Sequence, residues 1–366
     1  MREPAGSSPT ALCRVRRDAP PLDRNGMMQL NATEPDRIRH NAAAHDVMGL
    51  AFALAETPGL PQPLIRVRQV ALRPQMVPTP DRYDSLDFAI DPAAGACWCF
   101  MRPDGHASFT RALMADIVRM QAEVRRLGMT GLDETGTKLR YFVMGSRTPG
   151  IFNLGGDLAL FARTIRNRDR DTLRAYGHGC VRALHENTHG YDAGAVTVAL
   201  VQGDALGGGF EAALAFDMIV AEKQARFGFP EILFNLFPGM GAYSYLARRI
   251  APALAERMIL SGRIYTADEL HELGVIDMVV DTGQGEQAVR DLITRQGRRH
   301  NAQQAIYRVR RRLNPVPLQE LLDVVDIWVD AALNLEEADL RKMQRLAAAQ
   351  MRRCGASPAP AVRTAG

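Results

Sequence analysis

Two glutamates lie in one of the most apolar parts of the chain. Glu211 follows three consecutive glycines in "GDALGGGFEAALAF", and Glu231 follows "FGFP" further along. Glutamate is rarely buried without a partner or a task. Two carboxyl groups in one apolar pocket do not both ionise readily, so one can stay protonated near neutral pH while the other acts as a base. The two residues therefore predict an acid/base pair.

The glycine triplet allows three interpretations. Gly207, Gly209 and Ala212 fit the dinucleotide fingerprint G-x-G-x-x-A after a strand, but the following helix is too short for that crossover and Glu222 ends the next strand too early. Glycines can also serve close backbone packing alone, which leaves Glu211 unexplained. We favour an oxyanion hole, in which free N–H groups at a helix N-terminus donate to a substrate carbonyl.

The segments around the glutamates alternate between strand and helix patterns. "AVTVALVQG" and "DMIVAE" are typical of buried parallel strands, and "GGGFEAALAF" is a short helix between them. "LRYFVMG" predicts another strand, and "ALMADIVRMQAEVRRLG" predicts a helix that ends at Gly128. From about residue 240 the pattern turns helical. The alternation predicts an α/β fold with a mainly parallel sheet.

Four regions follow from these patterns. Residues 1–60 mix Pro, Ala, Arg and Asp without a sustained period and predict a poorly ordered extension. The folded core is expected over 61–262, and a helical C-terminal region over 263–352. The end of the chain, 353–366, predicts a disordered tail.

The composition is that of a soluble globular protein. Of the 366 residues, 46% are hydrophobic and 23% charged, and the formal charge of +4 is too small to indicate nucleic-acid binding. No apolar run approaches the roughly 18 residues that span a bilayer, and the N-terminus lacks the apolar core of an export signal. We expect a cytoplasmic protein whose five cysteines are reduced thiols.

One motif suggests a metal, but weakly. "HENTH" (185–189) fits the zinc-protease pattern H-E-x-x-H, with Glu186 as base. It falls at the end of its helix, directly before Gly190, whereas a zinc-binding pair needs a stable helix interior. We interpret it as a solvated helix end and predict neither a metal nor a cofactor.

Two stretches resemble the crotonase (enoyl-CoA hydratase/isomerase) superfamily. "ALVQGDALGGGFEAALAFDMIVAEKQARFGFPE" resembles its central signature, and "FNLGGDL" (152–158) resembles its first oxyanion segment. The resemblance covers about residues 85–345. It implies a crotonase fold: a spiral of ββα turns over 61–262 and a helical C-terminal region that builds trimers or hexamers.

Within the superfamily, the chain is most similar to the diffusible signal factor synthases of bacterial quorum sensing. "VMGSRTPGIFNLGGDLALFARTI", "PEILFNLFPGMGAYSYLARRI" and "IWVDAALNLEEADLRKMQRL" carry this likeness. Such enzymes are thought to dehydrate a 3-hydroxyacyl chain on acyl carrier protein and then hydrolyse the thioester, releasing a cis-2-unsaturated fatty acid. Asn153 and Leu154 depart from the small residues usual in the wider superfamily, a departure shared with this subgroup.

The resemblance also implies site residues. Gly156 and Gly208 are expected to donate backbone N–H bonds to the thioester oxygen, Glu231 to remove the α-proton, and Glu211 to protonate the departing 3-hydroxyl. The residues expected to bind the substrate are Leu154, Gly155, Phe237, Met240 and Gly241. Asp157 is expected to cap the following helix rather than to touch the substrate.

Alternatives remain for the function and the partners. The chain could be an ordinary enoyl-CoA hydratase or isomerase acting on acyl-CoA, or a catalytically reduced regulator bound by the receiver domain of a sensor histidine kinase. Residues 294–312 carry seven arginines and no acid. Most such runs are solvated helix faces; the functional alternative is a docking site for the acidic acyl carrier protein.

Overall fold

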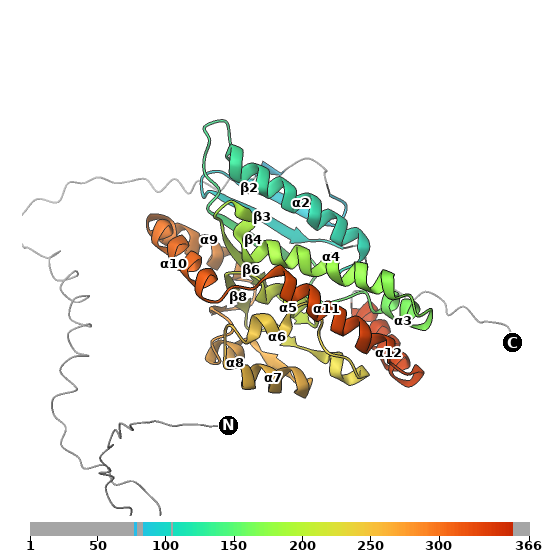
Figure 1. The fold of residues 1–366 in the computed structure, drawn as a ribbon. Helices are drawn as coiled ribbons and strands as arrows, with labels where there is room; N and C mark the ends of the chain where they lie inside the picture. The colour runs from blue at the N-terminus through green and yellow to red at the C-terminus, as the bar shows by residue number, and fades with distance from the viewer. Residues whose placement is uncertain (1–76, 79–82, 104, 354–366) are drawn as a thin grey trace, which may run out of the picture. The chain divides into compact units, whose positions relative to one another are not determined.

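The structure is a computed structural model that describes residues 77–78, 83–103 and 105–353 (Figure 1). The predicted N-terminal extension and all but the first residue of the predicted tail lie outside these residues.

The larger sheet of the described residues has seven strands in the order β1-β2-β3-β4-β6-β8-β11. These strands are β1 (Val77–Pro78), β2 (Leu86–Asp91), β3 (Ala96–Met101), β4 (Tyr141–Ser146), β6 (Val196–Val201), β8 (Met218–Glu222) and β11 (Met278–Val280). From β3 to β11 all neighbours are parallel, while β1 and β2 add antiparallel strands at one edge. The central strands are buried along their whole length, as expected where both faces of a parallel sheet are covered.

A second sheet of four strands carries the segments that will matter for the site. Its order is β10-β9-β7-β5, with β5 (Ile151–Asn153), β7 (Asp204–Leu206), β9 (Arg226–Gly228) and β10 (Ile264–Thr266). β5, β7 and β9 run parallel to one another. Each directly follows a strand of the larger sheet, so the chain repeats a turn of two strands and a helix.

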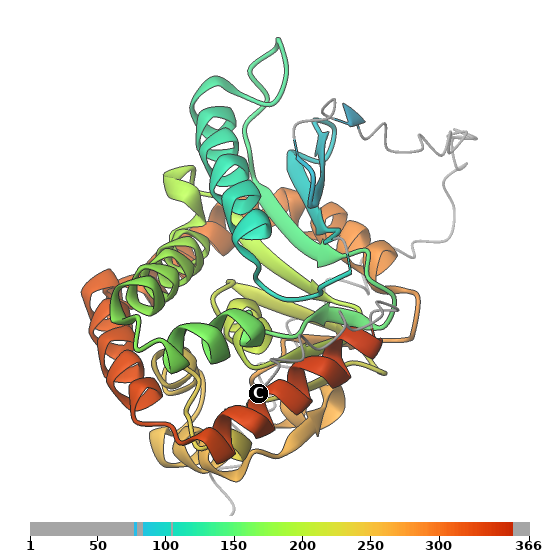
Figure 2. The ribbon, with the colours of Figure 1, turned by 90° about the vertical axis from the view of Figure 1, so that its right-hand side faces the viewer.

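Helices cover the sheets and supply the rest of the pocket. They are α2 (Arg111–Thr130), α3 (Leu158–Arg166), α4 (Arg170–Thr188), α5 (Gly208–Leu214), α6 (Ala242–Leu246), α7 (Pro252–Ser261), α8 (Ala267–Glu272), α9 (Gly285–Gln296), α10 (His300–Leu313), α11 (Leu318–Leu333) and α12 (Glu337–Arg353), with a 3-10 turn η2 (Pro230–Phe234). In Figures 1 and 2, α11 runs alongside α4 and α12 alongside α3, although these pairs are far apart in the sequence. None of the described helices is long and apolar enough to cross a bilayer.

The side chains of β3 point alternately to the two faces of the larger sheet, and each face has its own hydrophobic cluster. Cys97 and Cys99 face the large core cluster beneath α2 and α4, whereas Trp98 and Phe100 face a smaller cluster under α9. Both cysteines are buried free thiols.

Two details of the predicted elements were wrong. The helix expected to end at Gly128 continues to Thr130, because Gly128 serves close packing instead: a Cβ there would lie 2.3 Å from the Cβ of Ala193. The region after residue 240 is not purely helical, since β10 and β11 interrupt it. The boundary at residue 262 stays a prediction.

Candidate active site

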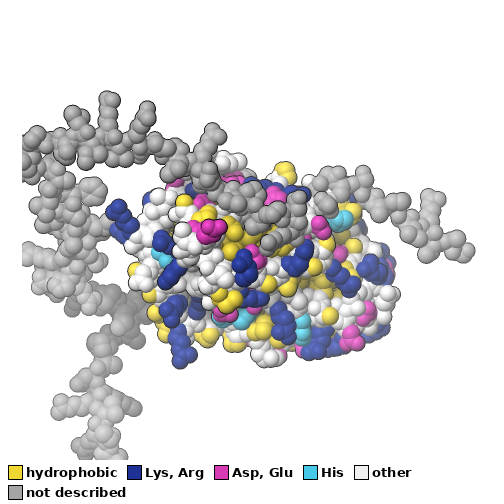
Figure 3. Space-filling model, turned by 90° about the horizontal axis from the view of Figure 1, so that it is seen from above, with side chains coloured by type: hydrophobic (Ala, Val, Ile, Leu, Met, Phe, Trp, Pro, Cys, Tyr) yellow, Lys and Arg dark blue, Asp and Glu magenta, His cyan; other side chains and the backbone are white. Residues whose placement is uncertain are grey.

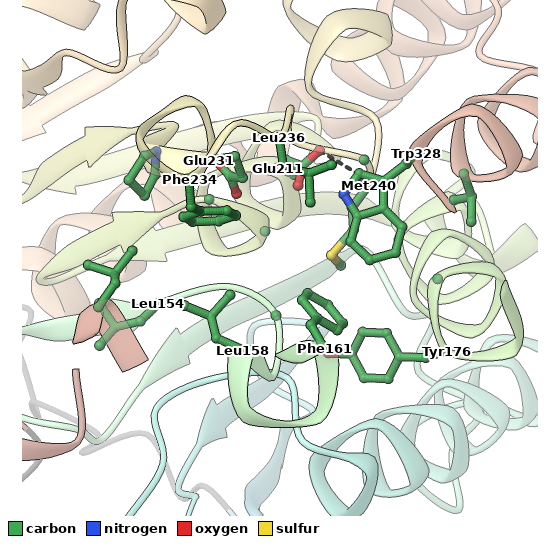
Figure 4. A pocket seen from close by; sticks show the side chains of 18 of the residues that line it. Leu154, Leu158, Phe161, Tyr176, Glu211, Glu231, Phe234, Leu236, Met240 and Trp328 are labelled. Carbon is green, nitrogen blue, oxygen red and sulfur yellow. Dashed lines mark hydrogen bonds between the residues drawn. The ribbon is translucent and has the colours of Figure 1, made fainter. Parts of the chain in front are cut away.

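One pocket of about 590 Å³ collects the four residues expected to carry the chemistry: Glu211, Glu231, Gly156 and Gly208. Figure 4 shows the two glutamates beside each other on one wall, across the pocket from Leu158. The remaining lining is mostly apolar and consists of Leu154, Phe161, Tyr176, Gly177, Gly207, Pro230, Phe234, Leu236, Gly239, Met240, Val325, Trp328, Leu346 and Gln350.

The sheet places the two glycine N–H groups side by side. β5 and β7 are parallel neighbours in which Asn153 pairs with Ala205, and Gly156 and Gly208 each lie three residues beyond these partners. The two segments touch, because a Cβ added to Gly155 would lie 2.9 Å from the N atom of Gly208. Gly155 also has φ +94°, a conformation that only glycine adopts without strain.

Neither N–H is used by the sheets. Phe109 forms an isolated bridge to this segment, but its N–H donates to the carbonyl of Gly155 at 2.8 Å and leaves the Gly156 N–H alone. Gly208 is the first residue of α5, where helical N–H groups have no intrahelical acceptor. Within the described residues, no hydrogen bond occupies the N–H of Gly156 or Gly208. Both donors are available to an oxygen in the pocket.

Glu211 is held rigidly. Its residue is only 1% exposed, and its Oε1 accepts the N–H of Met240 at 2.7 Å and of Ala242 at 2.9 Å. Burial raises the pKa of Glu211 well above its usual value, the nearby Glu231 raises it further, and the two N–H bonds oppose this shift. Burial is the largest of these influences, so the pKa of Glu211 lies above that of an exposed glutamate.

The side chain of Glu231 accepts its own backbone N–H and has no hydrogen bond to another described residue, so the surrounding shape holds it in place. It lies in the 3-10 turn after Pro230, and its Oε2 is buried with no hydrogen-bond partner among the described residues. Its Oε1 lies where a side chain on Gly207 would be, 2.3 Å from an added Cβ. Burial raises the pKa of Glu231 to about 7. A carboxyl group with such a pKa exchanges protons readily at neutral pH.

Of the five residues expected to bind the substrate, two line the pocket and three do not. Leu154 and Met240 line the pocket, whereas Gly155 lies behind it, against Gly208. Phe237 is half-buried against the core and does not line the pocket. Gly241 does not line the pocket either. It precedes α6 and has a φ of +110°, and the N–H of the first residue of α6, Ala242, donates to Glu211. For all five residues, contact with the substrate stays a prediction.

The predicted cap is confirmed. Asp157 precedes α3, and its Oδ1 accepts the N–H of Leu160 at 2.9 Å.

Several pocket residues were missed because they come from distant helices. Tyr176 belongs to α4, Trp328 to α11, and Leu346 and Gln350 to α12. Each stands at a core-facing position of an amphipathic helix, and the sequence pattern is the same whether such a position meets the core or a cavity. Trp328 lies in "IWVDAAL", a stretch used for the family resemblance, which was the one available signal.

The "HENTH" helix ends at Thr188, as expected. His185 Nε2 lies 3.1 Å from the carbonyl of Val316. Among the described residues, no three histidine, cysteine, aspartate or glutamate side chains gather as a metal site.

The arginine-rich segment is only partly a solvated face. Arg310 and Arg311 turn inward and form ion pairs with the buried Asp217. The other five are exposed: Arg295, Arg298, Arg299, Arg308 and Arg312. Elsewhere, as on the face in Figure 3, basic side chains are scattered with acidic ones among them.

The enoyl-CoA hydratase/isomerase family model matches residues 100–322, which is more than half of the chain. The chain belongs to this family. Among curated proteins, this family member is similar to the 2,3-dehydroadipyl-CoA hydratase of Escherichia coli, with 43% identity over 82 residues. That match covers 22% of this chain and 32% of the relative, so the chain spans about a third of that enzyme's length.

Solved structures agree with the fold. Pseudomonas aeruginosa DspI has a TM-score of 0.50 at 25% identity, covering 60% of this chain and 78% of DspI. The enoyl-CoA hydratase of Bacillus halodurans has a TM-score of 0.59 at 20% identity, covering 72% of this chain and 99% of that one. The predicted crotonase fold, with its mainly parallel sheet and C-terminal helices, is confirmed.

Proposed function

We propose that this family member dehydrates a 3-hydroxyacyl thioester carried on acyl carrier protein and then hydrolyses the thioester, giving a cis-2-unsaturated fatty acid signal. The observation that supports it is the meeting of Glu211, Glu231 and the free N–H groups of Gly156 and Gly208 in one apolar pocket. The likeness to P. aeruginosa DspI and the sequence stretches shared with the synthases favour this subgroup.

In the first step, the two N–H groups bind the thioester oxygen and stabilise the negative charge that develops there, each contributing about 3 kcal/mol. Glu231, with its pKa of about 7 and an unpartnered oxygen, removes the α-proton. Glu211, protonated through burial, gives a proton to the 3-hydroxyl, which leaves as water. The products are an α,β-unsaturated thioester and a water molecule.

In the second step, a water molecule adds to the thioester carbonyl and the carrier thiol leaves. After the first step Glu231 carries the α-proton and Glu211 is ionised, so Glu211 takes a proton from the attacking water and Glu231 gives its proton to the leaving carrier thiolate, which returns both residues to their starting states. The same N–H pair of Gly156 and Gly208 binds the tetrahedral oxyanion. The products are the free unsaturated acid and the thiol of the carrier.

The decisive experiment is incubation with 3-hydroxydodecanoyl-acyl carrier protein, followed by mass spectrometry and chromatographic separation of cis and trans acids. We expect free cis-2-dodecenoic acid. Release of trans-2-enoyl thioester without any free acid would exclude the synthase function.

The second candidate is an ordinary enoyl-CoA hydratase or isomerase. It is favoured by the family match and by the 43% identity to a CoA-thioester hydratase over the central segment. A turnover at least tenfold faster with 2-enoyl-CoA than with the carrier-bound 3-hydroxyacyl chain, with no hydrolysis, would establish it.

A regulator bound by a receiver domain is a third possibility. Because Glu211 and Glu231 both keep raised pKa values in the pocket, we expect catalysis rather than binding alone. Signal production in a host strain should disappear when both are replaced by Ala; signalling that survives both changes would favour the regulator.

We also propose self-association through α10. This helix packs on the domain with its polar side, where Gln304 and Arg310 bond to the core, and turns apolar residues outward. Ile306, Val309 and Leu313 are 64%, 56% and 73% exposed on one stripe of the helix. A helix oriented in this way needs a cover, and a second copy, as in the trimers of the superfamily, supplies one.

Light scattering tests this interface. Val309→Asp should convert an oligomer to monomer, while Ile327→Asp, which alters an equally exposed residue on α11, should not. A wild-type monomer would exclude it.

We further propose that the exposed arginines of residues 294–312 attract the acidic acyl carrier protein. The KM for the carrier-bound substrate should then rise with salt more steeply than the KM for the same acyl group on CoA.

A further inference from the structure

The backbone groups of the first oxyanion segment are almost all engaged. The N–H of Leu154 donates to Ala107 at 2.7 Å, and the carbonyl of Gly155 accepts from Phe109 at 2.8 Å. These two bonds fix the segment to the loop before α2. They leave one peptide group, between Leu154 and Gly155, to be held by side chains.

Asn153 holds the N–H of that peptide. Its Oδ1 accepts the N–H of Gly155 at 2.8 Å, and the residue is only 1% exposed. Without Asn153, the Gly155 N–H would compete with the Gly156 N–H for an oxygen in the pocket, or remain unpaired at a cost of about 1–3 kcal/mol. This side chain therefore selects which of two successive N–H groups is free.

Gln350 holds the carbonyl of the same peptide. Its Nε2 donates to the carbonyl of Leu154 at 3.1 Å, from α12 near the end of the described chain. It lines the catalytic pocket and also a neighbouring hollow of about 700 Å³ that opens beside His106 and Arg163. The peptide is thus held between a residue from its own strand and a residue from the last helix.

We propose that Asn153 and Gln350 are positioning residues that fix the Leu154–Gly155 peptide so that the Gly156 N–H points at the thioester oxygen. The inference rests on the oxyanion hole of the proposed function. It also gives a reason for the polar residue at position 153, where the wider superfamily has a small one.

The test uses a bound chromophore that needs no turnover. The absorption band of 4-(dimethylamino)cinnamoyl-CoA moves to longer wavelength as its carbonyl oxygen accepts stronger hydrogen bonds. We expect a clear shift with the wild-type protein, and a shift reduced by at least half with Gln350→Leu and with Asn153→Leu. The kcat should fall about tenfold in each variant, with KM changed less than threefold, since the lost alignment matters most in the transition state.

Matched variants separate positioning from structure. Gln344→Leu makes the same change on α12, where Gln344 bonds only to Arg166, and should behave as wild type. Asn153→Asp keeps an acceptor for the Gly155 N–H and should retain most of the band shift. If both leucine variants bind the probe with an unreduced shift, the positioning role is wrong. If the wild-type protein itself leaves the band unmoved, the proposed function fails, and this inference fails with it.

Discussion

The α5 segment and the η2 turn each bring one glutamate to the same pocket, but they hold it differently. In α5, Glu211 is fully buried and accepts two backbone N–H bonds from the segment before and at the start of α6. In η2, Glu231 has a buried oxygen without a partner and is confined by the bare backbone of Gly207. One carboxyl group is tied in place, and the other is only enclosed.

This difference suits two roles. A tied, buried carboxylic acid keeps its proton and its position, which a proton donor to a leaving group needs. An enclosed carboxyl group with a pKa of about 7 can lose and regain a proton without breaking a hydrogen bond to another residue. Two residues of one type are thus suited by their surroundings to the proposed roles of acid and base.

The largest expected effect comes from removing either proton-transferring group. Glu211→Gln and Glu231→Gln should each lower the rate of enoyl product formation roughly 10³-fold. In Glu211→Gln, the amide oxygen can still accept the N–H groups of Met240 and Ala242, so the melting temperature should not fall below that of wild type. Single-turnover assays check the rates; a variant that keeps a tenth of the activity would contradict the acid/base pair.

The position of Glu231 can be disturbed by a substitution at Gly207, which lies against its carboxyl group. Gly207→Ala places a Cβ 2.3 Å from Glu231 Oε1 and should lower kcat about 10- to 100-fold. Gly150→Ala is the control, because Gly150 has a similar positive φ (+67°, against +53° at Gly207) but open space around its Cβ. Both should lose about 1–2 kcal/mol of stability from backbone strain, so only the activity separates them. Equal activities would show that Gly207 does not shape the site.

The pH dependence of stability sharpens the comparison. Because the pKa of Glu231 rises from 4.5 to about 7 on folding, the folded state binds more protons, and wild-type stability falls as pH rises from about 4.5 to 7. Glu231→Gln removes this loss and should be more stable than wild type by about 1–3 kcal/mol at pH 8, with no such gain at pH 4. For Glu211→Gln the gain should begin in the same pH range, because the unfolded glutamate ionises near pH 4.5 and the pKa of Glu211 is also raised on folding. Urea unfolding at several pH values tests this; a variant whose gain in stability does not grow between pH 4 and pH 8 would contradict it.

The smallest expected effect concerns the acyl chain. Phe234 lines the pocket and Phe237 does not, so the matched changes Phe234→Leu and Phe237→Leu should differ. We expect the first to shift the preferred acyl length by about two carbons, since about 1 kcal/mol attaches to each buried methylene. The second should change KM less than twofold. Competition between acyl thioesters of different length provides the measurement.

The parts of the site that sequence reasoning found are local in the chain. Glycines followed by Glu211 directly after a strand fix a turn and a short helix, whatever the rest of the protein does. The same holds for Asp157, whose capping bond reaches only three residues. Such features depend on residues that are close in the sequence, so a sequence pattern can predict them.

The wall opposite the glutamates depends on packing between distant helices. Trp328 and Gln350 reach the pocket only because α11 and α12 fold back alongside α4 and α3. The orientation of α10 shows the same limit, because its apolar stripe would be expected to face the core, yet Arg310 faces inward to meet the buried charge of Asp217. The orientation of α10 is thus set by Asp217, a buried carboxylate directly before β8 and far away in the sequence, and the residue pattern of α10 alone does not predict it.

The pairing of β5 with β7 has a consequence for how the product leaves. Adjacent strands lie about 4.8 Å apart, so N–H groups carried three residues beyond a strand pair are close enough to donate to the same atom. A thioester or a tetrahedral alkoxide presents one such oxygen, whereas a fatty carboxylate spreads its charge over two. For the proposed hydrolysis, this spacing favours binding of the thioester over binding of the carboxylate product, and we expect product inhibition to be weak.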